Sequence, residues 1–142
     1  MRIKTIRRCV MAKATKERLL SFSIKDKPGL LSEITTRLSK AKVNVSAICA
    51  YAWDDTAYFD MTTDSNAKAK KALKDLKLEF EEEDVISVEM PNKVGELDKV
   101  TKIIADAVID IGYMYGTTSI GKTSTCLFST SDNKKALKLI NT

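Results

Sequence analysis

An internal repeat constrains the fold of this chain more than any other feature of its sequence. The segment Lys27-Pro28-Gly29 recurs 66 residues later as Lys93-Val94-Gly95, within a chain of 142 residues, and the apolar positions after it keep their spacing. The matched pairs are Leu31 with Leu97, Leu38 with Ile104, Ala41 with Ala107, Val43 with Ile109, and Val45 with Ile111. Two units of similar structure are therefore expected.

Each copy shows the same succession of local patterns. Alternating apolar and polar residues predict a strand over 20–24 and again over 85–90. Apolar residues at helical spacing then predict a helix in each copy. These residues are Leu30, Leu31, Ile34 and Leu38 in the first copy, and Leu97, Val100, Ile104 and Ala107 in the second. The predicted hairpin strands and second helix are 43–53, 57–61 and a helix ending at 76 in the first copy, and 111–118, 123–130 and 133–140 in the second.

The last strand of the repeat is predicted in only one copy. Residues 77–83 supply it in the first copy, but the 66-residue offset would place its counterpart beyond Thr142. The order βαββαβ thus predicts an α+β protein of two repeats, each an antiparallel sheet backed by helices, with the second repeat lacking its own last strand. Because an unpaired sheet edge invites pairing, we expect part of residues 2–10 to lie along it.

Charge and cysteine content bound the function. The formal net charge is +5, but the excess of Lys and Arg lies in a basic N-terminal extension, residues 1–18. This extension has no interleaved aromatic residues, so nucleic acid is not a favoured partner. The chain has three widely spaced cysteines and no histidine, so we expect no metal site and no cofactor. Without a stretch of about 20 apolar residues or a signal peptide, we expect a cytoplasmic protein with no membrane partner.

One motif argues for an enzyme and is set aside on its context. Residues 116–123, Gly-Thr-Thr-Ser-Ile-Gly-Lys-Thr, fit the P-loop pattern that binds phosphate. A P-loop must open a helix, whereas residues 124–130 are β-branched and alternating, which predicts a strand. Since no nucleophile lies beside a recognisable base either, we expect no catalytic residues and no enzymatic activity.

The run from Lys25 to Ile34, followed by Leu38 to Val45, resembles the ACT domain, a regulatory module that commonly senses amino acids. The resemblance covers residues 19–142, and implies ferredoxin-like ACT domains at 19–84 and 85–142, as in stand-alone tandem ACT proteins without an attached enzyme. ACT domains usually have Gly where this chain has Lys42 and Val108, so we expect a less glycine-dependent turn at both helix ends. The second copy also replaces Pro28, Asp26 and Asn44 by Val94, Asn92 and Asp110, so the two copies differ chemically.

The turns before the two first helices can bind a zwitterion. Free N–H groups beside Gly29 and Gly95 would donate to a carboxylate, and Asp26 or Asn92 would accept from an ammonium group. The resemblance implies a ligand held between this turn of one domain and the second strand of another, in a homodimer or within the chain. The candidate residues are Asp26, Pro28, Gly29, Leu30, Leu31, Asn44, Val45 and Ser46 in the first copy, and Asn92, Gly95, Glu96, Leu97, Asp110 and Ile111 in the second.

Two alternatives stay open at this point. Asp26 and Asn92 could serve only as helix caps, with Pro28 suited to the first helical turn and Asn44 to a turn of its own. In function, the alternative to a regulatory amino acid-binding protein is a protein-protein assembly module without a ligand, which docks a partner enzyme. A partner enzyme and a small ligand are therefore the partners to be tested.

Overall fold

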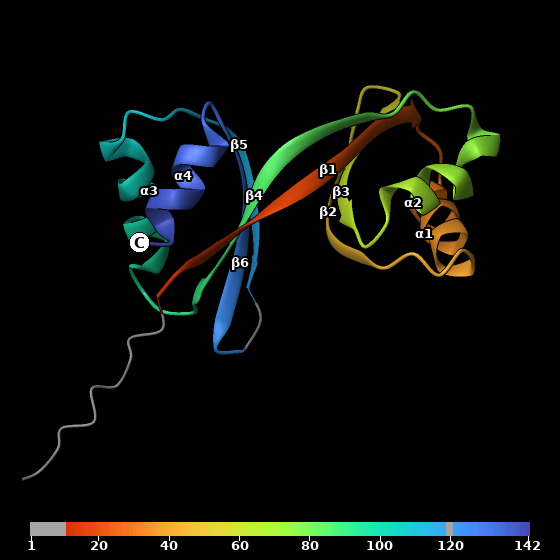
Figure 1. Ribbon diagram of the computed structural model, residues 1–142. Helices are drawn as coiled ribbons and strands as arrows, with labels where there is room; N and C mark the ends of the chain where they lie inside the picture. Colours follow the sequence, from red (N-terminus) through yellow and green to blue (C-terminus); the bar gives the residue numbers. More distant parts are fainter. Residues whose placement is uncertain (1–10, 119–120) are drawn as a thin grey trace, which may run out of the picture. The chain divides into compact units, whose positions relative to one another are not determined.

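The computed structural model describes residues 11–118 and 121–142 of the chain (Figure 1). Its elements in chain order are β1 (Lys13–Lys25), α1 (Leu30–Lys40), β2 (Val45–Trp53), β3 (Thr56–Thr63), α2 (Asn66–Ala72), the 3-10 helix η1 (Lys74–Leu76), β4 (Glu81–Pro91), α3 (Glu96–Asp106), β5 (Ile111–Thr118), β6 (Thr123–Thr130) and α4 (Asn133–Ile140). The α+β class, the two hairpins and the two pairs of helices are confirmed. None of the helices in this part of the chain is long and apolar enough to cross a membrane.

The chain divides into two compact units. The first-copy unit comprises Glu17–Asp84, and the second-copy unit comprises Val85–Thr142 together with the described residues up to Lys16. The hydrogen-bonded strand order is β2-β3-β1-β4-β6-β5, so β2 and β5 are the outermost strands. In each unit both helices cover the same face of the sheet, α1 and α2 in one and α3 and α4 in the other (Figure 1).

The beginning of β1 supplies the strand that the second copy lacks. Ala14 is buried in the core of the second-copy unit with Ile86 and Val88. The Asn141 side chain fixes it there, accepting from the Ala14 N–H at 2.7 Å and donating to the Ala14 carbonyl at 2.9 Å. Pairing at this edge thus begins at Lys13, whereas residues 2–10, where it was expected, lie outside the described part of the chain.

The expectation of separate strands at 77–83 and 85–90 is wrong, because β4 runs without a break from Glu81 to Pro91. Residues 77–90 contain no Gly, Pro or Asn, and the single Asp between the two predicted strands, Asp84, does not turn the chain. The charged residues Glu83 and Asp84 lie within the strand, where the Asp84 carboxylate accepts from Arg18 at 3.1 Å. Charged side chains on a strand weaken the apolar pattern by which the strand is recognised in the sequence, but they do not end the strand.

Each unit has its own hydrophobic core, formed by alternate strand residues and one helix stripe. In the first-copy unit Phe22 of β1 stacks on Phe59 of β3 with ring centroids 4.9 Å apart. The helix residues that complete this core are Leu30, Ile34, Leu38, Ala69 and Leu73. In the second-copy unit their counterparts are Val100, Ile104, Ala136 and Ile140, which pack with Phe128. The helical and strand periods read from the sequence therefore select the buried faces, except that Leu31 and Leu97, which belong to the predicted helix stripes, are 50% and 43% exposed.

The prediction that the helix ends avoid a glycine-like conformation is wrong. Lys42 and Val108 both have positive φ, at 57° and 56°. The chain must reverse here so that the next residue returns to the core, and its N–H donates to a helix carbonyl: Val43 to Leu38 at 2.9 Å and Ile109 to Ile104 at 3.2 Å. These bonds hold non-glycine residues in the left-handed region.

The two ends of the P-loop-like segment lie on the strands of a hairpin, and residues 119–120 lie outside the described part of the chain. Gly116 belongs to β5 and pairs with Cys126 of β6, and strand β6 begins at Thr123, the last residue of the motif. The strand interpretation of residues 124–130 is confirmed. A phosphate-binding loop requires a helix N-terminus at this position, and a strand follows instead.

Candidate ligand sites at the two glycine turns

The turn before α1 is built on Gly29, which occupies the N-cap position in the left-handed region with φ 81°. An L side chain is strained in that conformation, although a Cβ here would meet nothing within 4 Å. Two backbone bonds close the turn: the Leu30 N–H donates to the Lys27 carbonyl at 3.2 Å, and the Glu33 N–H donates to the Gly29 carbonyl at 3.0 Å. No side chain caps this helix.

The first turn of α1 presents hydrogen-bond donors to a small cavity. Within the described residues, the N–H groups of Leu31 and Ser32 have no hydrogen-bond partner. Both residues line a cavity of about 280 Å³, which Asp26 also lines. The Asp26 carboxylate makes no ion pair in the described part of the chain, and its backbone N–H donates to the Asp55 carbonyl at 2.7 Å. Donors for a carboxylate and an acceptor for an ammonium group therefore line one cavity.

The turn before α3 repeats this backbone geometry. Gly95 is the N-cap with φ 88°, and the Lys99 N–H donates to its carbonyl at 3.1 Å. The N–H groups of Leu97 and Asp98 have no hydrogen-bond partner within the described residues. A cavity of about 380 Å³ lies here, lined by Asn92, Glu96, Leu97 and residues of β4, β5 and β6.

The two turns differ in the polar side chain that precedes the glycine. The Asn92 amide donates to the Gly121 carbonyl at 3.2 Å, and the Asn92 N–H donates to the Lys122 carbonyl at 2.8 Å. Asn92 thus ties its turn to the β5–β6 hairpin, a structural role that the Asp26 side chain does not have. Neither residue caps its helix, so that alternative is wrong for both.

Several candidate residues lie away from these cavities. Asn44 exchanges hydrogen bonds with Asp64, at 3.0 Å from the Asn44 N–H to the carboxylate and 3.0 Å from the Asp64 N–H to the Asn44 carbonyl. Asp110 makes the equivalent pair with Ser131. The Ser46 hydroxyl lies 2.8 Å from the Thr62 hydroxyl. Pro28, Val45 and Ile111 also do not line the turn cavities described above.

The cavity floors come from hairpin residues that sequence reasoning missed. In the first-copy unit Ala50 of β2 pairs with Phe59 of β3, and in the second-copy unit Gly116 pairs with Cys126. A small residue therefore faces each turn from the outer strand. At Gly116 a Cβ would come within 2.6 Å of the Cys126 Sγ. The period-2 alternation of the strands shows which face of the sheet Ala50 and Gly116 belong to. It does not show which loop approaches that face.

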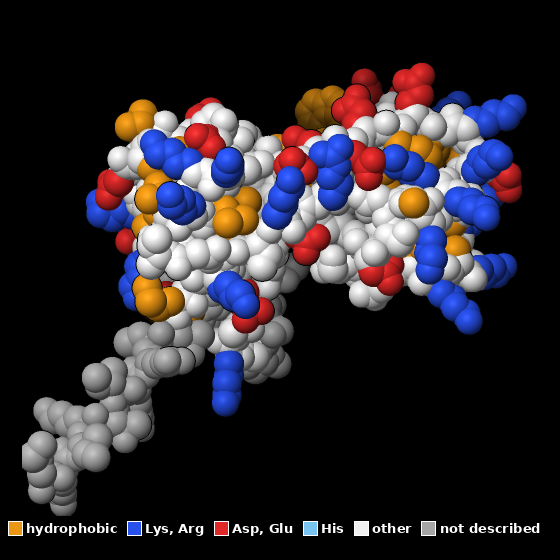
Figure 2. Space-filling view, in the orientation of Figure 1, with side chains coloured by type: hydrophobic (Ala, Val, Ile, Leu, Met, Phe, Trp, Pro, Cys, Tyr) orange, Lys and Arg blue, Asp and Glu red, His pale blue; other side chains and the backbone are white. Residues whose placement is uncertain are grey.

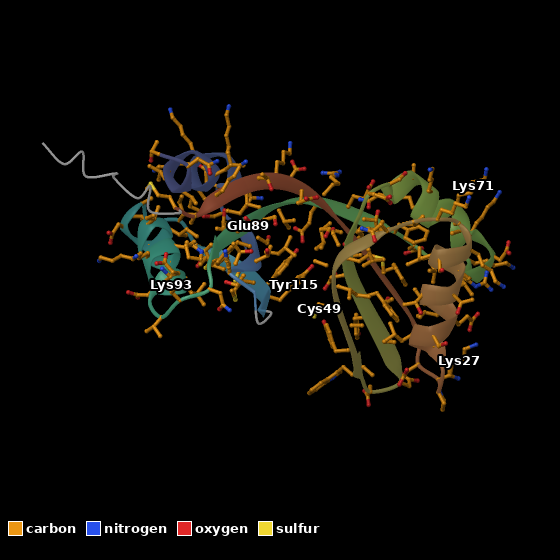
Figure 3. The ribbon with its side chains drawn as sticks, turned by 90° about the horizontal axis from the view of Figure 1, so that it is seen from below. Lys27, Cys49, Lys71, Glu89, Lys93 and Tyr115 are labelled. Atoms are coloured by element: carbon orange, nitrogen blue, oxygen red, sulfur yellow. The ribbon has the colours of Figure 1, made fainter. Side chains whose placement is uncertain are left out.

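Electrostatics also distinguish the two turns. In the first-copy unit Lys27 pairs with Glu33 at 2.9 Å, and Arg37 reaches the same carboxylate at 3.4 Å. The hydrogen bond from Lys27 is the main cause that lowers the pKa of Glu33, with Arg37 adding to it. Lys93 occupies the matching position before α3 and makes no ion pair within the described residues. Figure 3 shows Lys27 and Lys93 at the starts of their respective helices.

Comparison with known families agrees with this geometry. Residues 15–142 match the family described as the ACT domain pair. The chain belongs to this family. Its two copies are therefore the two ACT domains of the pair, and membership points to a regulatory, ligand-binding role. No curated protein matches the sequence.

Solved structures show the same fold. Protein BT0572 from Bacteroides thetaiotaomicron is 28% identical, with a TM-score of 0.80, over 89% of this chain and 87% of that chain. The ligand-free regulatory subunit of aspartate kinase from Thermus thermophilus is 15% identical, with a TM-score of 0.69, over 94% of this chain and 97% of that chain. The aspartokinase regulatory subunit from Thermus flavus is similar at 17% identity and a TM-score of 0.63, over 94% and 97%.

Proposed function

We propose that this ACT domain pair is a non-catalytic regulatory protein that binds an amino acid, or a similar small zwitterion, at the glycine turn of its first copy. The observation that carries the proposal is the cavity beside Gly29. There the N–H groups of Leu31 and Ser32 and the Asp26 carboxylate, all without partners in the described residues, line one space of about 280 Å³. That volume is just below the range of about 300–1,000 Å³ for ligand pockets, which suits a ligand smaller than a drug.

The second turn is a weaker candidate for a zwitterion. The Asn92 amide already donates to the Gly121 carbonyl, and an amide carries no negative charge to attract an ammonium group. Glu96 takes the place of Leu30, but Lys99 lies 2.9 Å from its carboxylate. We therefore expect the first copy to dominate binding, with the second copy weaker or selective for another ligand.

Relatives of this fold support the regulatory part of the proposal. Two of them are regulatory subunits of aspartate kinase, and one solved structure is Escherichia coli aspartokinase III in complex with lysine and aspartate. On this basis we propose a cytoplasmic protein whose ligand changes its association with a second copy or a partner enzyme. The outer strand β2, with Tyr51 and Trp53 exposed at 53% and 75%, offers an edge for such association.

A thermal-shift screen against the twenty amino acids tests the proposal. A ligand present at 100 times its Kd stabilises the folded protein by about 2.7 kcal/mol, a shift that is easily measured. We expect one or a few amino acids to raise Tm, and Asp26→Asn to abolish the rise, because it removes the charge that binds the ammonium group and retains the size. Asp106→Asn on α3 is the matched control, since Asp106 contacts Lys102 and lines neither turn cavity.

The assembly module without a ligand predicts a different result. All twenty amino acids would then leave Tm unchanged, and the Asp26→Asn variant would behave as the natural chain. ATP with magnesium serves as a further control, because a functional P-loop at 116–123 would make Tm respond to it. A flat amino acid screen would overturn the sensor proposal and favour docking of a partner.

A further inference from the structure

The second-copy unit contains an apolar groove of about 860 Å³ that adjoins the turn cavity and shares Pro91, Asn92, Lys93 and Glu96 with it. Its floor is formed by Met11, Ala12, Pro91, Val100, Ile103 and Ile140. These residues come from the segment before β1, the end of β4, α3 and the end of α4. Leu97, Met114 and Gly116 line only the turn cavity, whereas Ala12, Ile103 and Ile140 line only the groove.

The internal repeat explains why the groove exists. The beginning of β1 takes, in the second-copy unit, the place that the beginning of β4 takes in the first-copy unit. The 66-residue offset therefore matches Ala14 with Phe80 and Ala12 with Leu78. Phe80 and Leu78 pack against the first-copy core, and the Phe80 ring meets Phe22 edge-on at 5.6 Å. Two large side chains that fill this space in one copy are thus alanines in the other.

A third exchange keeps the groove apolar. The same offset matches Ile103 on α3 with Arg37 on α1, which forms ion pairs with Glu33 and Asp75. Ile103 is partly buried against the core and lines the groove. A space opened by loss of bulk is costly unless it is filled, and an empty apolar cavity attracts apolar ligands.

The rim of the groove is positively charged. Lys93, Lys99 and Lys122 line it with a single acidic side chain, Glu96, which Lys99 contacts at 2.9 Å. Lys93 and Lys122 make no ion pair in residues 11–118 and 121–142. Figure 2 shows many Lys and Arg side chains on one face of the molecule, some of them beside Asp and Glu. The groove thus combines a hydrocarbon floor with lysines that can pair with an anion.

We propose that this groove binds an amphipathic carboxylate, a compound with the hydrocarbon body of a medium-chain fatty acid and one anionic head. The body lies on Ala12, Val100, Ile103 and Ile140, and the carboxylate pairs with Lys93 and Lys122. A volume of about 860 Å³ is within the range of pockets that bury most of a ligand's surface. A polar zwitterion is a poor occupant, because most of the floor is hydrocarbon and the acidic side chain at the rim, Glu96, is already paired with Lys99. The site differs in ligand class from the glycine turn of the first copy.

Displacement of a fluorescent fatty acid tests the proposal. The full chain is titrated with dansyl-labelled undecanoic acid, and decanoate is added as competitor. We expect saturable binding that decanoate displaces and that decanol, which lacks the carboxylate, displaces about tenfold less well. Ala12→Leu, which installs the first-copy residue, should weaken binding at least about tenfold by filling the groove, and Ile103→Arg should do the same.

Charge variants distinguish the contribution of the ligand's carboxylate from that of its hydrocarbon body. The double variant Lys93→Ala/Lys122→Ala should weaken decanoate about tenfold or more and leave decanol unchanged, since a hydrogen bond to a charged group is lost. Lys102→Ala, on α3 but outside the groove, is the matched control and should have no effect. Thermal unfolding of each variant verifies that it is folded. If Ala12→Leu or Ile103→Arg unfolds, the lysine variants, which change only exposed side chains, still test whether the groove binds the carboxylate.

Four results would overturn the proposal. Absence of saturable binding to the full chain would show that the groove takes no such ligand. Binding that persists unchanged in Ala12→Leu and in the double lysine variant would place the ligand elsewhere. If decanol and decanoate displaced the probe equally well, the carboxylate would not contribute to binding. A shift of Ala12→Leu to a smaller oligomer on size-exclusion chromatography would identify the groove as a contact with a second copy.

Discussion

Replacement of Val108 by glycine should stabilise the protein, although it removes a hydrophobic side chain. Val108 follows the end of α3 with φ 56°, and its side chain is 93% exposed, so almost no buried area is lost. A left-handed conformation costs an L residue about 1–2 kcal/mol, and a β-branched residue is a genuine outlier there. Glycine carries no such cost but adds about 0.5–1 kcal/mol of unfolded-state entropy. The net expectation is about 0.5–1 kcal/mol of added stability.

Differential scanning calorimetry and urea denaturation would measure this change. For a chain of 142 residues, about 0.5–1 kcal/mol corresponds to a rise in Tm of roughly 1–4 °C. Val94→Gly is the matched control, because Val94 is fully exposed but has no positive φ. It should lower stability by the entropy of glycine alone. If Val108→Gly lowered Tm as much as Val94→Gly does, the strain attributed to this helix end would be absent.

Three further predictions follow from single contacts. Gly116→Ala should destabilise the second-copy unit by about 1–3 kcal/mol, because its Cβ would lie 2.6 Å from the Cys126 Sγ, and Cys126→Ala should restore much of the loss in urea titrations. The Cys126 thiol, whose pKa burial raises, should react with a maleimide only after unfolding, and rapid labelling of Cys126 itself in the native chain, located by peptide mapping, would contradict its burial. Hydrogen bonds from Lys70 and Asn66 lower the pKa of Glu82, so its stabilisation is present above pH about 4 and is lost as the pH falls through the lowered pKa. Glu82→Gln should therefore cost stability at pH 7, and the difference in urea midpoint from the natural chain should shrink on acidification; a difference independent of pH would refute the assignment.

Much of the candidate site was predictable because it depends on local geometry. Gly29 and Gly95 stand where a strand meets a helix, and glycine is the residue that adopts a positive φ at such a corner without strain. The matching donors of the first helical turn follow from helix geometry alone. The residues facing the turns, such as Ala50 and Gly116, could not be assigned in the same way, because which strand residue approaches a turn depends on the pairing register and on the packing of the helix.

The sequence by itself determined the repeat, the βαββα order of each copy and the buried face of each element, since all three follow from periodicities within short segments. Only the tertiary structure decided that β1 begins at Lys13 and completes the second-copy sheet, and that β4 runs unbroken through Glu83. The length of a strand, and the sheet that it joins, depend on hydrogen bonds between residues distant in the chain. Local sequence patterns carry no information about these bonds. The groove beside Ala12 has the same origin: a small residue leaves a space only where its neighbours are fixed by the rest of the fold.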